Sequence, residues 1–231
     1  MISVTIPVFN NRKYALNLLF YIENNIYLPN EIFLIDDGSS EDIKSLADQF
    51  KNLPIKYIRH DQNMGYNYSC NEGIKLSKGE YISVLNNDIL INEYFFKKIK
   101  QAFLENPNAA IICPNTVQRE EMISSCTNEI IFATKMKKRE GWAWTARASF
   151  IKNIPPIPNF LRNYYGDDYI FHCAKLLNYN CLKDINNFCF HYNGATVKKT
   201  PSASVRHRKE EGILWNNFIP SLEKEFKNEK Y

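Results

Sequence analysis

Residues 3–22, SVTIPVFNNRKYALNLLFYI, combine an apolar segment, a polar turn and a segment with helical spacing. The apolar and largely β-branched segment SVTIPVF is typical of a buried strand. After Asn10, apolar side chains recur at i, i+3, i+4 and i+7, which places on one helix face Ala15, Leu18, Leu19 and Ile22. The stretch therefore predicts a strand followed directly by a helix, the unit from which parallel sheets are built.

The same alternation continues through the first half of the chain. Further apolar segments predict strands: EIFLI (31–35), IKYIR (55–59), YISVL (81–85) and AAIIC (109–113). Helical segments are expected between them: one with Ile43, Leu46, Ala47 and Phe50, one over residues 66–77, and one from Phe95 that stops before Pro107. This alternation predicts an α/β fold, with a Rossmann-like and mainly parallel sheet covered by helices on both faces.

Polar segments follow the strands where each strand ends. They are PVFNN (7–11), DDGSS (36–40), HDQNMG (60–65) and NND (86–88). Ligands of open α/β sheets bind outside the carboxyl ends of the strands. Because parallel strands end at the same edge of a sheet, these four segments should meet there and form one binding site.

The second half of the sequence has weaker patterns. Residues 114–150 give no clear assignment, and the prolines of IPPIPNF interrupt regular structure. GDDYIFHCAKLLNY predicts a helix with carboxylates in its first turn, and NCLKDINNFCFHYNGAT predicts one or two short strands. The polar tail contains an apolar segment, ILWNNFI, that is expected to dock as a helix. No repeat or low-complexity linker marks a second domain.

The composition is that of a globular protein, with 231 residues of which 45% are hydrophobic. A net charge of +4 fits anionic small ligands, nucleic acid or a membrane surface, and selects none of them. The six cysteines form no C-x-x-C pair, which does not favour zinc. The N-terminus is unlike a signal peptide, and no window approaches about 18 apolar residues. We therefore expect a cytoplasmic protein, and peripheral contact with a membrane stays open.

The segment SVLNNDILIN (83–92) runs from a strand directly into Asn86, Asn87 and Asp88. These side chains suit a tight turn, and their oxygens also suit a hard divalent cation. The sequence contains neither G-x-G-x-x-G after a strand nor G-x-x-x-x-G-K-[ST]. A nucleotide bound without those loops needs another counter-charge for its phosphates, and a divalent cation would supply it.

Six segments in order resemble the family 2 glycosyltransferases: VTIPVFNN, FLIDDGSSED, NMGYNYSCNEGIKLSKGEY, VLNNDILI, GDDYIF and HYNGAT. The resemblance covers roughly residues 2–197 and implies a single-domain GT-A fold with a smaller, mixed acceptor-side region. It also implies transfer of a sugar from a nucleotide-sugar to a hydroxyl acceptor, with inversion. Residues 1–113 would form the nucleotide-sugar-binding half, residues 114–200 the acceptor and catalytic half, and residues 201–231 a C-terminal tail or lid.

The resemblance assigns the donor site to the first half of the chain. Asp36 or Asp37 would accept the N–H of a uracil-like base, which implies a UDP-sugar donor. A strand-to-helix turn capped by Ser39 or Ser40 is an alternative interpretation, and both can hold at once. The other residues expected around the donor are Pro7, Val8, Phe9, Asn63, Gly65, Asn86 and Asn87.

The resemblance also gives the NND segment a metal-binding role. NND occupies the place of the family's D-x-D motif, with Asn86 where the first acidic residue is usual. An amide oxygen binds a hard cation more weakly than a carboxylate, so Asp88 is expected to be the main ligand. His191 of HYNGAT would complete the shell of Mn²⁺ or Mg²⁺, and imidazole favours Mn²⁺. A plain turn and an inert histidine are the alternatives.

GDD matches the family's acidic pair ahead of a helix. Asp168 would be the general base that removes the proton of the acceptor hydroxyl, and Asp167 would be the reserve choice or would orient the acceptor. Two carboxylates at a helix start can also simply complement the helix dipole. Trp142 and Trp144 would form an acceptor wall, or else pack on one face of a strand.

Two other functions are compatible with these residues. One is a non-catalytic GT-A protein that binds a nucleotide or a glycan, because NND lacks an acid. The other is a glycosyltransferase that acts on modified nucleic acid, suggested by the basic segments KMKKR (135–139), VKKT (197–200) and VRHRK (205–209). A glycan or another hydroxyl compound is the expected acceptor in the main interpretation.

Overall fold

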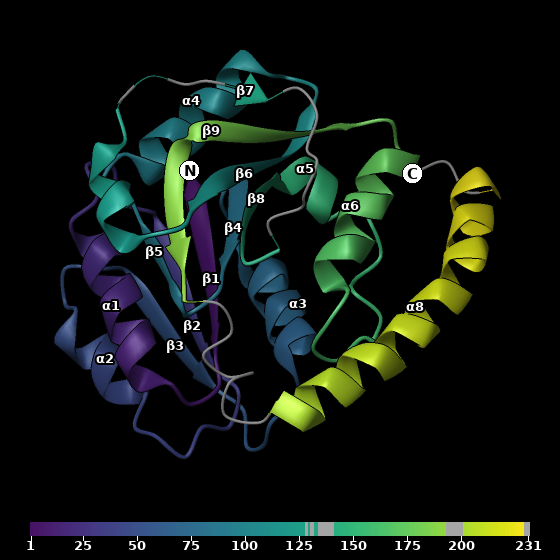
Figure 1. Cartoon of the computed structure of the whole chain (residues 1–231), viewed down its shortest axis with the longest axis horizontal. Helices are drawn as coiled ribbons and strands as arrows, with labels where there is room; N and C mark the ends of the chain where they lie inside the picture. Colours follow the sequence, from purple (N-terminus) through teal and green to yellow (C-terminus); the bar gives the residue numbers. More distant parts are fainter. Residues whose placement is uncertain (128, 130–131, 134–140, 193–200, 229–231) are drawn as a thin grey trace.

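The computed structural model describes residues 1–231 except for 128, 130–131, 134–140, 193–200 and 229–231. The basic segments KMKKR and VKKT and the end of HYNGAT lie outside the described residues. Figure 1 shows one twisted sheet between two groups of helices, with strands in the order β3-β2-β1-β4-β8-β6-β9-β5 and β7 paired to β9. The expected fold class, a single-domain α/β protein of GT-A type, is confirmed.

The first half of the chain builds the parallel part of the sheet. Its strands are β1 (Ile2–Val8), β2 (Glu31–Asp36), β3 (Ile55–Arg59) and β4 (Tyr81–Leu85). The helices that connect or follow them are α1 (Arg12–Glu23), α2 (Lys44–Gln49), α3 (Tyr66–Leu76) and α4 (Phe95–Glu105). β1 pairs in parallel with both β2 and β4, and β2 pairs in parallel with β3. These elements are the ones that the sequence predicts.

The remaining strands, from β5 onward, have mixed directions. They are β5 (Ile89–Ile91), β6 (Ala109–Val117), β7 (Phe132–Ala133), β8 (Ala143–Arg147) and β9 (Asn180–His191). β8 pairs antiparallel with β4 and β6, whereas β6 and β9 are parallel. The expectation of one or two short strands before His191 resolves into the single strand β9. β5 and β8 have no counterpart in the sequence prediction.

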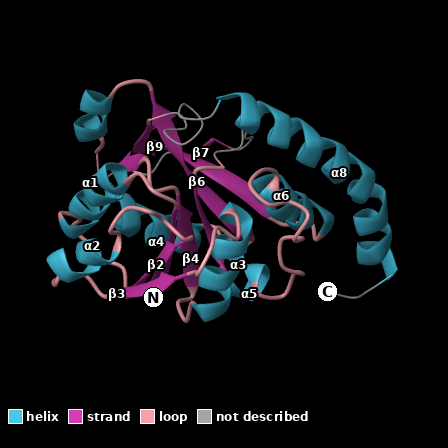
Figure 2. Cartoon of the chain, turned by 90° about the horizontal axis from the view of Figure 1, so that it is seen from below, coloured by secondary structure: helices cyan, strands magenta, loops and turns pink. Residues whose placement is uncertain are grey.

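The remaining helices cover the second half of the sheet. They are the 3-10 helix η1 (Glu120–Ser125) and the α-helices α5 (Ala148–Ile151), α6 (Gly166–Leu176) and α8 (Pro201–Asn228). Figure 1 and Figure 2 both show α8 running along the outside of the molecule, on the α6 side. The apolar tail segment lies inside α8, where Trp215 and Leu222 are buried.

Two apolar cores lie on opposite faces of the sheet. One contains the apolar side chains of α1, α2 and α4, and the other contains those of α3, α5, α6 and α8. β1 shows how the sequence separates the faces: Ile2, Val4 and Ile6 enter the first core, while the small polar side chains of Ser3 and Thr5 face the second. α3 packs closely there, because a Cβ on Gly73 would lie 2.2 Å from the Thr5 methyl carbon.

Within the described part of the chain, none of the helices has the length and hydropathy needed to cross a bilayer. All six cysteines are described, and all are free thiols. Burial raises the pKa of two of them, the thiols of Cys70 and Cys173, the latter to about 12. These thiols are therefore poor nucleophiles and serve as core packing.

Candidate active site

The polar strand ends meet at one edge of the sheet. Hydrogen bonds join neighbouring ends directly: the Asp37 N–H donates to the Val8 carbonyl (2.8 Å), and the His60 N–H donates to the Asp36 carbonyl (2.9 Å). The Asn10 N–H donates to the Ser39 hydroxyl (2.8 Å). Pro7 and Val8 are buried in β1, whereas Phe9 emerges at the edge with 38% of its surface exposed. The predicted convergence of these segments is confirmed by the parallel pairing of β1, β2, β3 and β4.

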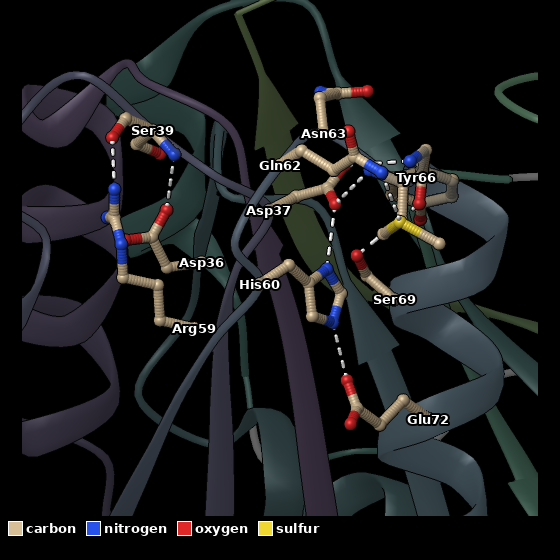
Figure 3. Close-up of polar contacts among 12 residues, drawn as sticks. Asp36, Asp37, Ser39, Arg59, His60, Gln62, Asn63, Tyr66, Ser69 and Glu72 are labelled. Carbon is tan, nitrogen blue, oxygen red and sulfur yellow. Dashed lines mark hydrogen bonds and ion pairs between the residues drawn. The ribbon is translucent and has the colours of Figure 1, made fainter.

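Asp36 organises the turn that follows β2. Its buried carboxylate accepts a hydrogen bond from the Ser39 N–H (2.8 Å) and pairs with the guanidinium of Arg59 (Figure 3). It also accepts a hydrogen bond from the Tyr57 hydroxyl (2.7 Å). Arg59 also donates to the Ser39 carbonyl (2.8 Å). Gly38 is needed in this turn because its φ is +74° and Gln62 backbone atoms approach it closely.

Asp37 connects the same turn to the next loop. Its carboxylate accepts hydrogen bonds from the N–H groups of Met64 (2.7 Å) and Gly65 (2.9 Å) and contacts His60 Nδ1 (2.8 Å). Asp36 and Asp37 thus each receive three polar contacts from within the protein. A carboxylate offers about four acceptor positions, so each could accept one further hydrogen bond.

Asn63 and Gly65 contact Arg162, which lies in the second half of the chain. The guanidinium of Arg162 donates to the Asn63 carbonyl (2.6 Å) and to its side-chain oxygen (2.9 Å). Gly65 has φ +108°, and a Cβ there would lie 2.4 Å from Arg162 Cγ. Only a residue without a side chain fits between the loop and Arg162.

Asp88 and His191 form a buried pair. His191 Nε2 lies 3.2 Å from Asp88 Oδ1, because antiparallel pairing sets Ile89 of β5 opposite His191 of β9. The Trp142 ring stacks on the imidazole, with centroids 4.9 Å apart and planes 16° apart. Trp142 is fixed in turn by a hydrogen bond from its Nε1–H to the Thr116 hydroxyl (2.9 Å).

The geometry of this pair fits a shared divalent cation. Two adjacent ligands of an octahedral cation with bonds of about 2.1 Å lie about 3.0 Å apart, close to the observed separation. Two buried nitrogens beside the pair, His191 Nδ1 and Asn87 Nδ2, have no hydrogen-bond partner in the structure. The described residues contain no group of three or more His, Cys, Asp or Glu side chains suited to a metal. Within the described part of the chain, a cation here would take further ligands from groups other than His, Cys, Asp and Glu side chains.

Asn86 is held by a tyrosine. The Tyr66 hydroxyl donates to Asn86 Oδ1 (2.7 Å), and the Asn86 N–H donates to the Trp142 carbonyl (2.8 Å). Burial raises the pKa of Tyr66 well above its usual value, and the negative charges of Asp167 and Asp88 raise it further. Tyr66 therefore remains a protonated donor, with Asp88 and Asp167 both near its hydroxyl.

The acidic pair lies in the first turn of α6. The carboxylate of Asp167 lies against Gly141, where a Cβ would be 2.1 Å from Asp167 Oδ2. Gly141 directly precedes Trp142, which stacks on His191, so the acidic pair and the Asp88–His191 pair border one region. Asp168 follows in the same turn and is half-buried.

Two elements hold the loop that leads into this turn. From α3, the Asn67 side chain donates to the carbonyls of Leu161 (2.8 Å) and Tyr164 (3.0 Å). From α8, the Glu211 carboxylate accepts the N–H groups of Asn163 (3.0 Å) and Tyr164 (2.9 Å). The loop ends at Tyr165, which has φ +59° and starts α6.

Several of these residues carry no functional signal in the sequence. Tyr66 and His60 lie in segments that predict only a helix and a strand end, and Glu211 lies in the polar tail. Arg162 follows a proline-rich stretch that has no periodicity. Trp144, by contrast, is 2% exposed in β8 and packs in a core, so of the two tryptophans only Trp142 borders the site.

A family model described as Glycosyl transferase family 2 matches residues 3–173. Glycosyltransferase GlyG of Streptococcus pneumoniae serotype 4 is 24% identical over 176 residues, which are 71% of this chain and 58% of GlyG. The crystal structure of S. aureus TarS 1–349 in complex with UDP is similar with a TM-score of 0.63 at 20% identity, over 84% of this chain and 58% of that one.

A second solved structure has the same fold. It is the mannosyltransferase PcManGT from Pyrobaculum calidifontis in complex with GDP-Man and Mn²⁺, with a TM-score of 0.64 at 14% identity, over 84% of this chain and 57% of that one. The chain thus spans less than three fifths of the length of each of these proteins.

Proposed function

This chain belongs to glycosyl transferase family 2, and on that premise we propose that it transfers a sugar from a nucleotide-diphosphate sugar to an acceptor hydroxyl. The donor is UDP-linked, the acceptor is a glycan or another hydroxyl compound, and transfer inverts the anomeric carbon. The observation that carries the proposal is the buried Asp88–His191 pair at 3.2 Å, on the same sheet edge as DDGSS and next to GDD.

The nucleotide lies over the ends of β1, β2 and β3 in this proposal. Pro7, Val8 and Phe9 border the base and ribose, and the remaining acceptor position on Asp36 or Asp37 takes the N–H of the base. Asn63 and Gly65 close the loop beside the donor. The UDP found in TarS supports a uridine nucleotide, whereas PcManGT holds GDP-Man, so the choice of nucleotide rests on experiment.

The diphosphate lies next to NND. Asp88 and His191 would hold a divalent cation, Mn²⁺ or Mg²⁺, whose positive charge would stabilise the leaving diphosphate. Asn86 and Asn87 would contact the donor or bound water there. Tyr66 keeps the Asn86 amide oriented through its 2.7 Å hydrogen bond, which fixes the metal side of the site before the donor arrives.

Asp168 is the general base. As the acceptor oxygen attacks the anomeric carbon, its proton passes to the Asp168 carboxylate, and the electrons of the breaking C–O bond leave with the diphosphate. Asp167 orients the acceptor hydroxyl. One in-line displacement of this kind inverts the anomeric configuration, and positioning of the two substrates supplies much of the acceleration.

The proposal is tested by thermal shift with UDP, GDP and their sugar derivatives, each with Mn²⁺, Mg²⁺ or a chelator. We expect UDP and a metal together to raise the Tm, because a ligand that binds only the folded state stabilises it. Asp88→Asn should remove the metal-dependent part of the shift. Asp48→Asn is the matched control, since Asp48 is exposed on α2 and pairs only with Lys44.

Three outcomes separate the alternatives. Nucleotide binding that is equal in Asp88→Asn and in Asp48→Asn contradicts the metal assignment. Binding of UDP-sugars without any release of UDP, over long incubation with hydroxyl acceptors, favours the non-catalytic nucleotide-binding protein. A protein that no nucleotide stabilises under any of these conditions contradicts the whole proposal.

A further inference from the structure

We propose that His60 is a positioning residue of the donor site, which as an imidazolium between Asp37 and Glu72 holds the loop of residues 60–65 in its binding shape. This inference rests on the proposed function, because that loop borders the proposed nucleotide. We call Asp37, His60 and Glu72 the His60 cluster. Its geometry is independent of the metal side of the site.

Both nitrogens of the His60 ring face carboxylates. Nδ1 lies 2.8 Å from Asp37 Oδ1, and Nε2 lies 2.6 Å from Glu72 Oε2 on α3 (Figure 3). The imidazole is 9% exposed and Asp37 is 4% exposed, so water has little access to that contact, whereas the Glu72 side chain is 32% exposed. The cluster therefore ties the turn after β2 to the body of α3 through one ring.

With both carboxylates ionised, this geometry favours protonation of both ring nitrogens. Neutral imidazole has one donor and one acceptor nitrogen, and the acceptor would then face a carboxylate lone pair. Imidazolium has two donors, and each would form a charge-assisted hydrogen bond. The pKa of His60 responds accordingly: burial lowers it, but the hydrogen bonds and charges of Asp37 and Glu72 outweigh burial and raise it above its usual value.

The other groups that face the ring do not alter this balance. The Tyr68 ring on α3 meets the imidazole edge-on, with centroids 5.3 Å apart. Arg59, the neighbour on β3, directs its guanidinium to Asp36 and to the Ser39 carbonyl. The cluster thus contains one cation and two carboxylates, and loss of the His60 proton leaves two negative groups beside a neutral ring.

Loss of that proton affects the loop of residues 60–65 through Asp37. The same Asp37 carboxylate accepts the N–H groups of Met64 and Gly65, so displacement of Asp37 from a neutral ring loosens both bonds. Because the folded-state pKa of His60 is raised, its stabilisation is complete below the unfolded value of about 6.5 and is lost as pH rises through the folded pKa. Donor affinity should fall over the same interval.

The test measures the His60 titration by NMR in the nucleotide-free protein, and the dissociation constant of UDP with saturating metal across the same pH range. Glu72→Gln removes one carboxylate and should move the His60 midpoint to lower pH. At a pH between the two midpoints, the dissociation constant of UDP should be at least about threefold higher for this variant than for the wild type. Glu105→Gln, an exposed glutamate on α4, is the matched control and should follow the wild type.

The comparison between the two glutamate variants is decisive, because pH also changes metal binding and the charge of the nucleotide phosphates in this range. A His60 midpoint at or below about 6.5, or one that Glu72→Gln leaves unchanged, overturns the His60 cluster. If Glu72→Gln lowers the His60 midpoint but binds UDP as tightly as Glu105→Gln does, the proposed effect of His60 on donor binding is wrong. Absence of UDP binding at every pH contradicts the proposed function and its donor loop, while the titration still reports on the cluster itself.

Discussion

At the scale of single residues, the polar side chains of the site have two kinds of role. Asp88, His191 and Asp168 are placed to contact substrates or a cation in the proposed reaction. Tyr66 instead directs its hydroxyl to Asn86, and Asp36 and Asp37 direct most of their acceptor positions to other residues of the chain, with one left for the proposed contact with the base. The second group fixes the shape of the site, which matters because catalysis depends on side chains held within fractions of an ångström.

The roles of Asp168 and Asp167 are separated by replacing each with asparagine. Removal of a general base typically lowers a rate by about 100-fold to 10,000-fold, so we expect Asp168→Asn to lose activity on that scale while UDP binding is unchanged. Asp167→Asn should instead raise the KM for the acceptor. Initial rates with a released-UDP assay measure both variants, and proton NMR of the product reports whether its anomeric configuration is inverted.

Wild-type turnover by Asp168→Asn would rule out that residue as the base. If Asp167→Asn proved the more severe defect in kcat, the two roles would be exchanged, which the position of Asp167 against Gly141 and near Tyr66 would allow.

The sequence predicts the roles of some of these side chains and gives no indication of the roles of others. The proximity of Asp88 and His191 is implied by the resemblance of NND and HYNGAT to segments of the family, and the structure places His191 Nε2 3.2 Å from Asp88 Oδ1. The hydrogen bond from Tyr66 to Asn86 leaves no trace in the sequence, since a tyrosine at a helix start is ordinary. The paired spacing of Trp142 and Trp144 was equally uninformative, because only packing decides that Trp144 is buried.

At the scale of elements, α8 is directly connected to the catalytic half. The Glu211 carboxylate is buried and accepts two backbone N–H groups from the loop that leads into GDD. The aromatic and aliphatic side chains of α8 pack on the same core as α6, and Trp215 meets Tyr169 edge-on at 6.3 Å between centroids. The C-terminal segment therefore supports the acidic pair and is more than a surface tail.

Replacement of Glu211 tests this connection. Glu211→Gln puts an amide nitrogen where a carboxylate oxygen accepted backbone N–H groups, and loss of hydrogen bonds to a charged group costs about 2 kcal/mol of stability. We expect a lower Tm and a kcat that falls more than UDP affinity does, because the loop ends at the catalytic pair.

Glu210→Gln is the matched control for this change. Glu210 is the neighbouring residue and is exposed, with only a 3.9 Å contact to Arg206. Equal Tm and kcat in the two variants would show that α8 does not influence the acidic pair. The two proteins can be compared by thermal unfolding and steady-state kinetics at one pH.

Elements of the first half are predictable because each strand and helix shows its own period. β5 is not predicted, because a strand of three residues is too short to show a period. β9 looks like two short strands because polar residues such as Asn186 and Asn187 interrupt its apolar pattern. In the structure, buried Asn92 donates to the Asn187 side chain, and buried Lys98 donates to the Asn186 carbonyl. The full length of α8 is not predicted, because its exposed face is highly charged and only the ILWNNFI segment is apolar.

At the scale of the whole molecule, one continuous sheet brings the two halves together. β8 and β6 lie between the parallel strands and β9. β9 in turn pairs with β5, which places His191 of β9 beside the loop that carries Asp88. The site is consequently built from both halves of the chain. Local pattern predicts the parallel half and the edge where ligands bind, but the long-range pairing of β9 with β5 and β6 depends on the completed fold.

The most direct measurement of the central claim is a crystal structure with UDP and Mn²⁺, with the metal located by anomalous scattering. If Asp88 and His191 hold the cation, one Mn²⁺ should lie within about 2.0–2.4 Å of an Asp88 oxygen and of a His191 nitrogen, with the diphosphate as a further ligand. The uracil should lie beside the DDGSS turn. A metal bound away from Asp88 and His191, or a nucleotide at the opposite end of the strands, would contradict it.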